Sequence, residues 1–335
     1  MLLGKRYALV AGGAGFIGSH LVDALVAAGY HVDAIDNMST GSLSNLEQHL
    51  APRESGPHVD PMEERPVAVV PQDVTLLRGD PARDNGRELG RYDVVYNLAC
   101  PASPKAYQLD PSATVMTNVL GTSNLLRLAK AHRARFIQAS TSEVYGDPLE
   151  HPQAESYLGN VNTWGPRACY DEGKRCAETL CYEAKRQGTD VRVARIFNTY
   201  GPRMDPDDGR VVSNFVRQAI KGEGLTVYGD GSQTRSFCYV SDLVRGLMML
   251  AAVRDAPDGP VNLGNDREFK ISELVELLTR WFPRLTVMPL PLPPDDPRVR
   301  RPDLTLAKRV LGYEPTVQLE SGLEAMIPWM RARLA

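Results

Sequence analysis

Tyr170 and Lys174 are the residues whose types and spacing most directly suggest chemistry. They lie four positions apart in the run YDEGK, so on a helix they would share one face. A lysine charge lowers the pKa of a nearby phenol, which allows a tyrosine to act as a base near neutral pH. A hydroxyl in the upstream run Ser140–Glu143 could share the proton of a substrate alcohol with the tyrosine. The pattern predicts proton transfer on an alcohol.

A second set of residues could hold a dinucleotide. The segment GGAGFIG fits GxGxxG from Gly13 and GxxGxxG from Gly12. Glycines permit a tight turn and a close backbone approach to a pyrophosphate, and the start of the next helix offers free N–H groups to phosphates. The expected cofactor contacts in this loop are Gly12, Gly15, Phe16, Ile17 and Gly18.

Two aspartates follow predicted strands at positions that suit the adenosine half of NAD. Asp36 lies 18 residues after Gly18. A carboxylate there would bind the ribose hydroxyls and repel a 2′-phosphate, which favours NAD over NADP; alternatively, Asp36 caps a turn. Asp73 could approach the adenine amino group or cap a turn. The remaining expected NAD contacts are Asn37, Val74 and Leu98, with Tyr170 and Lys174 at the reacting end.

The elements that must position these residues alternate along the chain. The predicted strands are Tyr7–Ala11, Val32–Ile35, Val67–Val70, Tyr92–Leu98, Arg135–Ala139 and Val191–Ile196. Predicted helices run from Phe16 to Gly29, over Thr114–Ala131 and over Tyr170–Arg186. This alternation is typical of an α/β fold with a doubly wound (Rossmann) parallel sheet.

A smaller C-terminal α/β lobe is predicted after about Asn198, where the composition shifts. Its predicted helices are Val211–Lys221, Val240–Ala252, Ile271–Phe282 and Leu304–Leu311. We expect residues 1–197 to bind NAD and 198–335 to bind the substrate, with a cleft between the lobes; the boundary is approximate and segments could interleave. The proline-rich stretch Ala51–Pro66 has no periodicity and is expected to be a mobile surface loop.

Composition excludes several classes of protein. The formal net charge of −3 is a poor basis for nucleic-acid binding. The five cysteines form no CxxC pair, which argues against a disulfide framework and a zinc site. No run of 18 apolar residues predicts a membrane span, and a strand begins too early for a secretory signal. We expect a cytoplasmic protein that needs no metal.

Several longer runs resemble a known family. They are NLACPASPKAY (97–107), STSEVYGDP (140–148), GPRACYDEGKR (165–175), RIFNTYGPRM (195–204), DDGRVVSNFVRQAIKGE (207–223), VYGDGSQTRSFCYVSDLV (227–244) and LPPDDPRVRRPD (292–303). With the glycine loop, Thr141, Tyr170 and Lys174, they resemble the extended short-chain dehydrogenase/reductase superfamily, which acts on nucleotide sugars. More narrowly, they resemble the UDP-glucuronate decarboxylases (UDP-xylose synthases), over nearly the whole chain.

The resemblance implies decarboxylation through a temporary oxidation. Tyr170 would take the proton of the sugar's C4 hydroxyl while NAD takes the hydride, and the resulting β-keto acid loses carbon dioxide. Returning the hydride gives UDP-xylose and regenerates NAD. Thr141, Tyr170 and Lys174 would act on C4, and Glu143 would assist decarboxylation or hold the ring; alternatively, Glu143 is a buried, ion-paired carboxylate without a chemical role. Ser142 stands where sugar 4,6-dehydratases carry an acidic Asp, which argues against dehydration.

The substrate's phosphates and carboxylate suit arginine forks. The resemblance assigns Arg235 to the diphosphate or the reacting sugar, Arg300 to the UDP moiety and Asn198 to the pyrophosphate; otherwise the two arginines are merely solvated. Lys105 could pair with the substrate carboxylate from a loop after a strand. The complete predicted substrate set is Lys105, Tyr107, Asn198, Arg210, Val212, Tyr228 (near uracil), Arg235 and Arg300.

Three alternatives and two departures from the family stay open. The alternatives are a UDP-sugar 4-epimerase, a decarboxylase that releases the UDP-4-keto-pentose with NADH, and a non-catalytic NAD-bound protein. The family often has His where Asn97 stands, and the loop Ala51–Pro66 is longer than usual. Apolar residues on several faces of Leu120–Ala131 and Ala177–Arg186 predict a homodimer, with no nucleic-acid or membrane partner.

Overall fold

The computed structural model describes residues 5–50, 66–77, 91–255, 257–291 and 299–335. The predicted loop Ala51–Pro66 lies outside these residues except for Pro66, as does the first part of the motif at 292–303. The chain divides into two compact units. The first unit is Met1–Pro101, Ser112–Ala139 and Cys176–Val193; the second unit is Ala102–Pro111, Ser140–Arg175 and Ala194–Ala335. The domain boundary near residue 197 stays a prediction.

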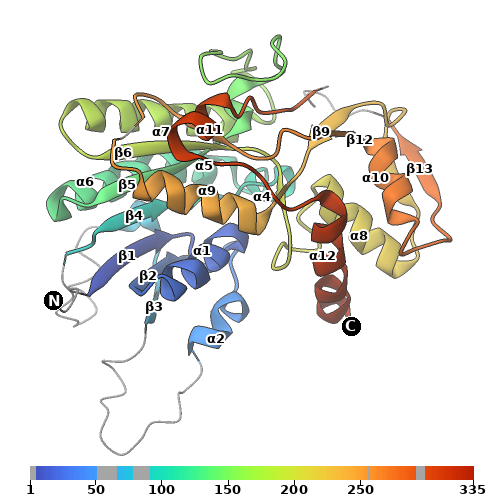
Figure 1. Cartoon of the computed structure of the whole chain (residues 1–335), viewed down its shortest axis with the longest axis horizontal. Helices are drawn as coiled ribbons and strands as arrows, with labels where there is room; N and C mark the ends of the chain where they lie inside the picture. Colours follow the sequence, from blue (N-terminus) through green and yellow to red (C-terminus); the bar gives the residue numbers. More distant parts are fainter. Residues whose placement is uncertain (1–4, 51–65, 78–90, 256, 292–298) are drawn as a thin grey trace, which may run out of the picture. The chain divides into compact units, whose positions relative to one another are not determined.

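Seven strands form one sheet in the order β11-β6-β5-β4-β1-β2-β3 (Figure 1). The strand pairs β1–β2, β2–β3, β1–β4, β4–β5 and β6–β11 are parallel. Parallel strands are covered on both faces, and Ala8 to Ala11 of β1 are fully buried. The predicted doubly wound sheet is therefore confirmed. The strands are β1 (Arg6–Ala11), β2 (Tyr30–Asp36), β3 (Val67–Pro71), β4 (Val94–Asn97), β5 (Arg135–Thr141), β6 (Val191–Ile196) and β11 (Val261–Leu263).

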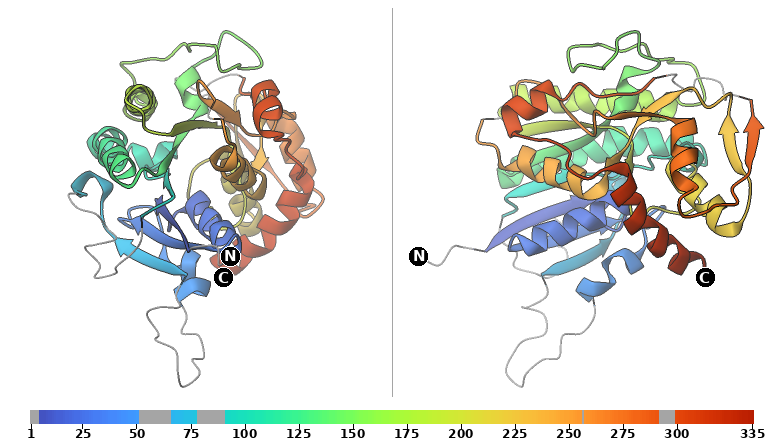
Figure 2. Two further views of the ribbon diagram at one scale, coloured as in Figure 1. Left: turned by 60° about the vertical axis from the view of Figure 1, so that its left-hand side comes forward. Right: turned by 45° about the vertical axis from the view of Figure 1, so that its right-hand side comes forward.

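The strand order reverses after β3, which creates the point where such folds bind ligands. The chain moves from β1 to β3 toward one edge and then from β4 to β6 toward the other. Because crossovers between parallel strands are right-handed, α1 (Phe16–Ala27) and α6 (Thr122–His132) cover opposite faces (Figure 2). The carboxyl ends of β1 and β4 flank the reversal and are the expected ligand edge.

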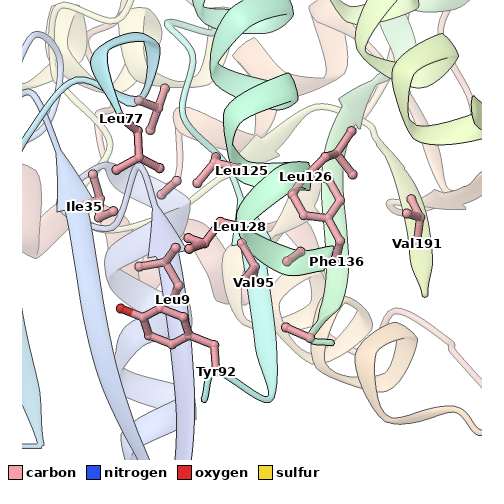
Figure 3. Close-up of a cluster of buried hydrophobic side chains, with 14 of the residues drawn as sticks. Leu9, Ile35, Leu77, Tyr92, Val95, Leu125, Leu126, Leu128, Phe136 and Val191 are labelled. Atoms are coloured by element: carbon pink, nitrogen blue, oxygen red, sulfur yellow. The ribbon is translucent and has the colours of Figure 1, made fainter. Parts of the chain in front are cut away.

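The hydrophobic core of the first unit lies between the sheet and α6 (Figure 3). Leu9 and Val95 project from neighbouring strands toward Leu125 and Leu128 of the helix. Each buried leucine or valine contributes about 1.5–3 kcal/mol of transfer free energy. The core also holds Tyr92, whose hydroxyl donates to Asp33 at 2.6 Å, so its polar end is satisfied. This packing fixes the strand ends that carry the cofactor residues.

The predicted helix Thr114–Ala131 is not one regular helix. It consists of α5 (Pro111–Met116), a π-helical turn η3 (Thr117–Gly121) and α6. The Asn118 side chain donates to the Thr114 carbonyl at 3.0 Å, the acceptor that an α-helical ladder would give to the Asn118 N–H. Apolar periodicity does not reveal such a turn. Short helical turns elsewhere in this unit are η1 (Leu43–Leu46), α2 (Glu47–Leu50) and η2 (Val74–Leu76).

The second unit contains short strand pairs and most of the C-terminal helices. The strands pair as β7–β10, β9–β12 and β8–β13. The bounds are α4 (Pro104–Tyr107), η4 (Ser142–Tyr145), β7 (Thr199–Tyr200), α8 (Val211–Lys221), β8 (Leu225–Tyr228), β9 (Thr234–Ser236), β10 (Cys238–Tyr239), α9 (Val240–Ala252), β12 (Glu268–Lys270), α10 (Ile271–Leu278), β13 (Val287–Leu290), α11 (Thr305–Leu311) and α12 (Leu319–Leu334). Helix α7 (Ala168–Arg186) begins in this unit and ends in the first.

Sequence patterns predict α8 and α9 with both bounds and overlook α12. Helix α12 contains Pro328, and a proline is a helix breaker because it lacks an N–H. Burial of Leu323, Met326 and Ile327 along one stripe outweighs that cost. Helix α10 ends at Leu278, earlier than the predicted Phe282. No helix in the described part of the chain is long and apolar enough to cross a membrane.

Candidate active site

The glycine loop of the first unit is folded as a tight turn. Gly12 has a φ of +78°, and a Cβ there would lie 2.7 Å from the Leu98 carbonyl oxygen. A Cβ on Gly18 would lie 2.0 Å from the Gly12 carbonyl oxygen. Only glycine fits either position. The loop packs against the carboxyl end of β4, because the Leu98 N–H donates to Ala11 at 2.9 Å.

The N-terminus of α1 has free capacity for an anion. Its N-cap is Gly15, which makes no side-chain cap, and its first turn contains no acidic residue. The N–H groups of Phe16, Ile17 and Gly18 therefore meet no capping side chain, and the helix dipole adds partial positive charge. These features of the chain fit a dinucleotide pyrophosphate.

Asp36 ends β2 beside the glycine loop. Its carboxylate accepts the N–H of Ala14 at 3.0 Å and that of Met38 at 2.9 Å. Burial raises the pKa of Asp36, while these backbone bonds oppose the rise. Two carboxylate oxygens can accept about four hydrogen bonds, so capacity remains for ribose hydroxyls. The turn-capping alternative and the NAD-binding role are thus compatible.

Asp73 acts as a cap in this structure. Its Oδ1 accepts the N–H and the hydroxyl of Thr75 at 2.8 and 2.7 Å, and its Oδ2 accepts from Asn37 at 2.8 Å. Burial would raise the pKa of Asp73, but these bonds hold it below its usual value. The capping alternative describes this geometry, while contact of Asp73 with adenine, and of Asn37 and the buried Val74 with NAD, stays a prediction.

Tyr170 and Lys174 lie in the first turns of α7, in the second unit. Both side chains are buried. The Lys174 ammonium lies 5.8 Å from the centre of the Tyr170 ring, which brings a positive charge to the phenol as the spacing predicts. Tyr107 stacks on Tyr170 with ring centres 5.0 Å apart and planes 5° apart. The stack fixes the Tyr170 ring and places Tyr107, a predicted substrate residue, beside it.

Thr141 lies at the end of β5 and begins the turn η4. Its hydroxyl oxygen accepts the Glu143 N–H at 3.2 Å, so it caps the turn. Because the oxygen is used as an acceptor, the hydroxyl hydrogen remains available to donate. This geometry suits a hydrogen bond to a substrate oxygen.

The Glu143 carboxylate lies between two guanidinium groups. Arg167 donates to its Oε2 at 2.5 Å, and Arg300 approaches the same oxygen at 3.5 Å. Burial would raise the pKa of Glu143, but the charges of Arg300, Arg167 and Arg235 hold it below its usual value. Glu143 is therefore ionised near neutral pH. Sequence patterns do not single out Arg167, although it lies in the run GPRACYDEGKR.

Arg300 and Arg235 are buried, so neither is a merely solvated arginine. Arg300 donates to the Ser142 carbonyl and to the Gly146 carbonyl, the latter at 2.9 Å. It thereby joins residues 299–303 to η4. Arg235 donates to Thr234 at 2.8 Å. Their contacts with UDP or the sugar stay predictions.

The other predicted substrate residues differ in exposure. Arg210 is held by Asp208 through two bonds of 2.6 and 2.8 Å, and its charge acts on Tyr170 and Glu143. Lys105 and Tyr228 are exposed, Asn198 is half-buried and Val212 is buried on α8. The second unit thus contains every predicted catalytic and substrate residue, and the first unit contains the glycine loop and the predicted adenosine contacts.

Comparison with known proteins identifies the family to which this chain belongs. The NAD dependent epimerase/dehydratase family matches residues 8–264, more than half of the chain. The chain belongs to this family. The extended short-chain dehydrogenase/reductase prediction is thereby confirmed.

Particular relatives narrow the comparison. The chain is 51% identical to UDP-glucuronic acid decarboxylase 5 of Arabidopsis thaliana over 330 residues, which cover 97% of this chain and 89% of that one. It is 48% identical to UDP-glucuronic acid decarboxylase 1 of Danio rerio, over 98% of this chain and 74% of that one. The solved structure of MoeE5 in complex with UDP-glucuronic acid and NAD matches with a TM-score of 0.78 at 29% identity, covering 98% of this chain and all of that one.

Proposed function

We propose that this protein converts UDP-glucuronate to UDP-xylose and carbon dioxide, using NAD that is regenerated in each cycle. The observation that carries the proposal is the ionised Glu143 held by Arg167 and Arg300, in the same unit as Thr141, Tyr170 and Lys174. Two guanidinium charges face the single carboxylate of Glu143, so one positive charge remains to attract the carboxylate of a bound uronate. A 4-epimerase acting on a neutral sugar has no need of this excess.

The chain's own residues account for binding and for the proton at C4. The glycine loop, the first turn of α1 and Asp36 would hold NAD, which when bound supplies a hydride acceptor. The Tyr170 phenolate takes the C4 hydroxyl proton, with Lys174 stabilising its charge and Thr141 donating to the same oxygen. The C4 ketone then accepts the electrons released as carbon dioxide leaves C5. Tyr170 finally returns its proton to O4.

The deciding experiment incubates the purified protein with UDP-glucuronate and NAD and identifies gas and nucleotide product. Carbon dioxide together with a nucleotide of UDP-xylose mass supports the proposal. An isomer of unchanged mass without gas indicates a 4-epimerase. Gas with one NADH per turnover indicates release of the UDP-4-keto-pentose. Tight NAD binding without turnover indicates a non-catalytic protein.

The proposed setting is a homodimer in the cytoplasm, with UDP-sugars as ligands and without nucleic-acid partners. The net charge of −3 supports the last point. Large apolar side chains exposed on helices of the first unit support the homodimer; they are Met116, Leu120 and Tyr182.

A further inference from the structure

Asp171 is a buried carboxyl group that the mechanism above does not use. Its side chain follows Tyr170 on α7 and is 6% exposed. Its Oδ1 has no hydrogen-bond partner within the described part of the chain. Buried polar atoms are nearly always paired, and an ionised carboxylate with an unpaired oxygen is costly to bury. The position therefore favours the protonated form.

The charged neighbours of Asp171 strengthen this preference. Burial and the charge of Glu143 raise the pKa of Asp171 to about 7, although Arg167 and Arg300 oppose the rise. Glu143 itself stays ionised because the same arginines bind it directly. When the pKa values of two neighbouring carboxyl groups are shifted in opposite directions, one group often serves as the acid and the other as the base. The titratable groups that interact with Asp171 are Tyr107 of α4, Glu143 of η4, Arg167, Cys169 and Glu172 in or beside α7, and Arg300.

The proposed reaction needs a proton at a second carbon. When the C5–carboxylate bond breaks, its electron pair forms the enolate of the C4 ketone. That pair must then form a C5–H bond, so each turnover consumes one proton. Tyr170 does not supply it, because the proton it takes from O4 returns to O4.

We propose that Asp171 holds this proton and that the Asp171–Glu143 pair delivers it to C5. This inference rests on the proposed function. The uronate carboxylate adds negative charge near the pair, which makes ionised Asp171 less favourable, so Asp171 takes up a proton as substrate binds. The enolate pair then forms the C5–H bond as an O–H bond of the pair breaks, the C4 carbonyl is restored, and solvent reprotonates the pair.

Proton uptake on binding is the first test. Calorimetry near pH 7 on the NAD-loaded Tyr170→Phe variant, which we expect to turn over at least about 10²-fold more slowly, measures protons taken up in buffers of different ionisation enthalpy. UDP-glucuronate should cause more uptake than UDP-glucose, which lacks the carboxylate. The additional Asp171→Asn substitution should remove the difference. Equal uptake for both ligands, or a difference that survives this substitution, overturns the proposal.

Turnover is the second test, with Glu172→Gln as the matched control one position along the helix. In Asp171→Asn, kcat for carbon dioxide release should fall about hundredfold or more with little change in KM, because direct general acids contribute about 10²–10⁴. The fall of wild-type kcat/KM above about pH 7, which reports Asp171 in the free enzyme, should disappear in this variant. An unchanged kcat and pH profile contradicts the role of Asp171.

Failure of the wild type to release carbon dioxide contradicts the proposed function instead. If Asp171→Asn does not fold, the difference in proton uptake between UDP-glucuronate and UDP-glucose in Tyr170→Phe alone decides.

Discussion

Single side chains carry the chemistry, and Glu143 is the most constrained of them. Its Oε2 is bound by Arg167 and approached by Arg300. Replacing Glu143 by Gln removes the charge and keeps the shape. Release of carbon dioxide should slow about hundredfold or more, while NAD binding, whose adenosine and pyrophosphate contacts we expect in the first unit, should change less. Gas release and NAD titration measure the two effects, and full turnover in the variant would remove Glu143 from the chemistry.

Tyr170 is the predicted base for the C4 hydroxyl. The Tyr170→Phe variant keeps the ring that stacks on Tyr107 but has no hydroxyl to accept a proton. Release of carbon dioxide should fall by at least about 10², with NAD still bound. Tyr182→Phe is the control, because Tyr182 lies on the same helix and is 61% exposed. Equal losses in both variants would refute a specific role for Tyr170.

Asp171 should also make the stability of the ligand-free protein depend on pH. Its pKa rises from 3.8 in the unfolded chain to about 7 in the fold. Its contribution to stability is therefore fully present below pH 3.8 and is lost as the pH rises through about 7. The Asn of Asp171→Asn stays neutral, so the stability of this variant relative to wild type should increase between pH 3.8 and about 7. The increase should reach up to a few kcal/mol in the free energy of unfolding and appear as a rise in relative Tm. Thermal unfolding at several pH values measures the trend, and a difference that is flat with pH would contradict it.

At the scale of elements, the glycine loop depends on close backbone packing at the start of α1. Gly18→Ala places a methyl group 2.0 Å from the Gly12 carbonyl oxygen. The loop must shift, so NAD affinity should fall sharply and stability by about 1–3 kcal/mol. NAD titration and thermal unfolding check this. Gly259→Ala is the control because its Cβ would meet nothing within 4 Å; normal NAD binding by Gly18→Ala would contradict the phosphate role.

The elements that sequence patterns predict best are those with uninterrupted periodicity. Strand β6 and helices α8 and α9 have the predicted bounds. The π-helical turn η3 escapes prediction because it arises from a local choice of carbonyl partner at Asn118. Helix α12 escapes because Pro328 weighs against a helix, while the burial that stabilises it is a tertiary effect.

At the scale of the whole molecule, sequence motifs single out candidate site residues but not the partners that these residues have in the fold. Thr141, Tyr170, Lys174 and the glycine loop stand out because motif and local element coincide. The pairing of Glu143 with Arg167 and Arg300 cannot be recognised in the sequence. Arg167 lies 24 positions from Glu143 and Arg300 lies 157 positions from it, and only the fold brings them together. The partners of Asn97, which stands where the family often has His, also come from the fold: its amide donates to Thr122 at 3.1 Å and to Gln138 at 2.9 Å.

Assembly can be tested at the same scale. If the exposed apolar residues of the first unit form the dimer contact, light scattering should give about twice the 36.9 kDa of one chain. Leu120→Asp should shift the mass toward one chain. Leu149→Asp serves as the control, because Leu149 is 82% exposed and lies in the second unit. A wild-type mass near 36.9 kDa would contradict the homodimer.

The bonds of Asp36 to Ala14 and Met38 have a consequence for anyone wishing to retarget the enzyme to a phosphorylated coenzyme. Exchanging this acid for a small neutral residue would remove the repulsion of a 2′-phosphate, but it would also strip two main-chain amides of their acceptor. If Asp36 binds the coenzyme as predicted, coenzyme selectivity and the shape of the surrounding turn depend on the same side chain. A successful redesign must supply replacement acceptors along with the new selectivity.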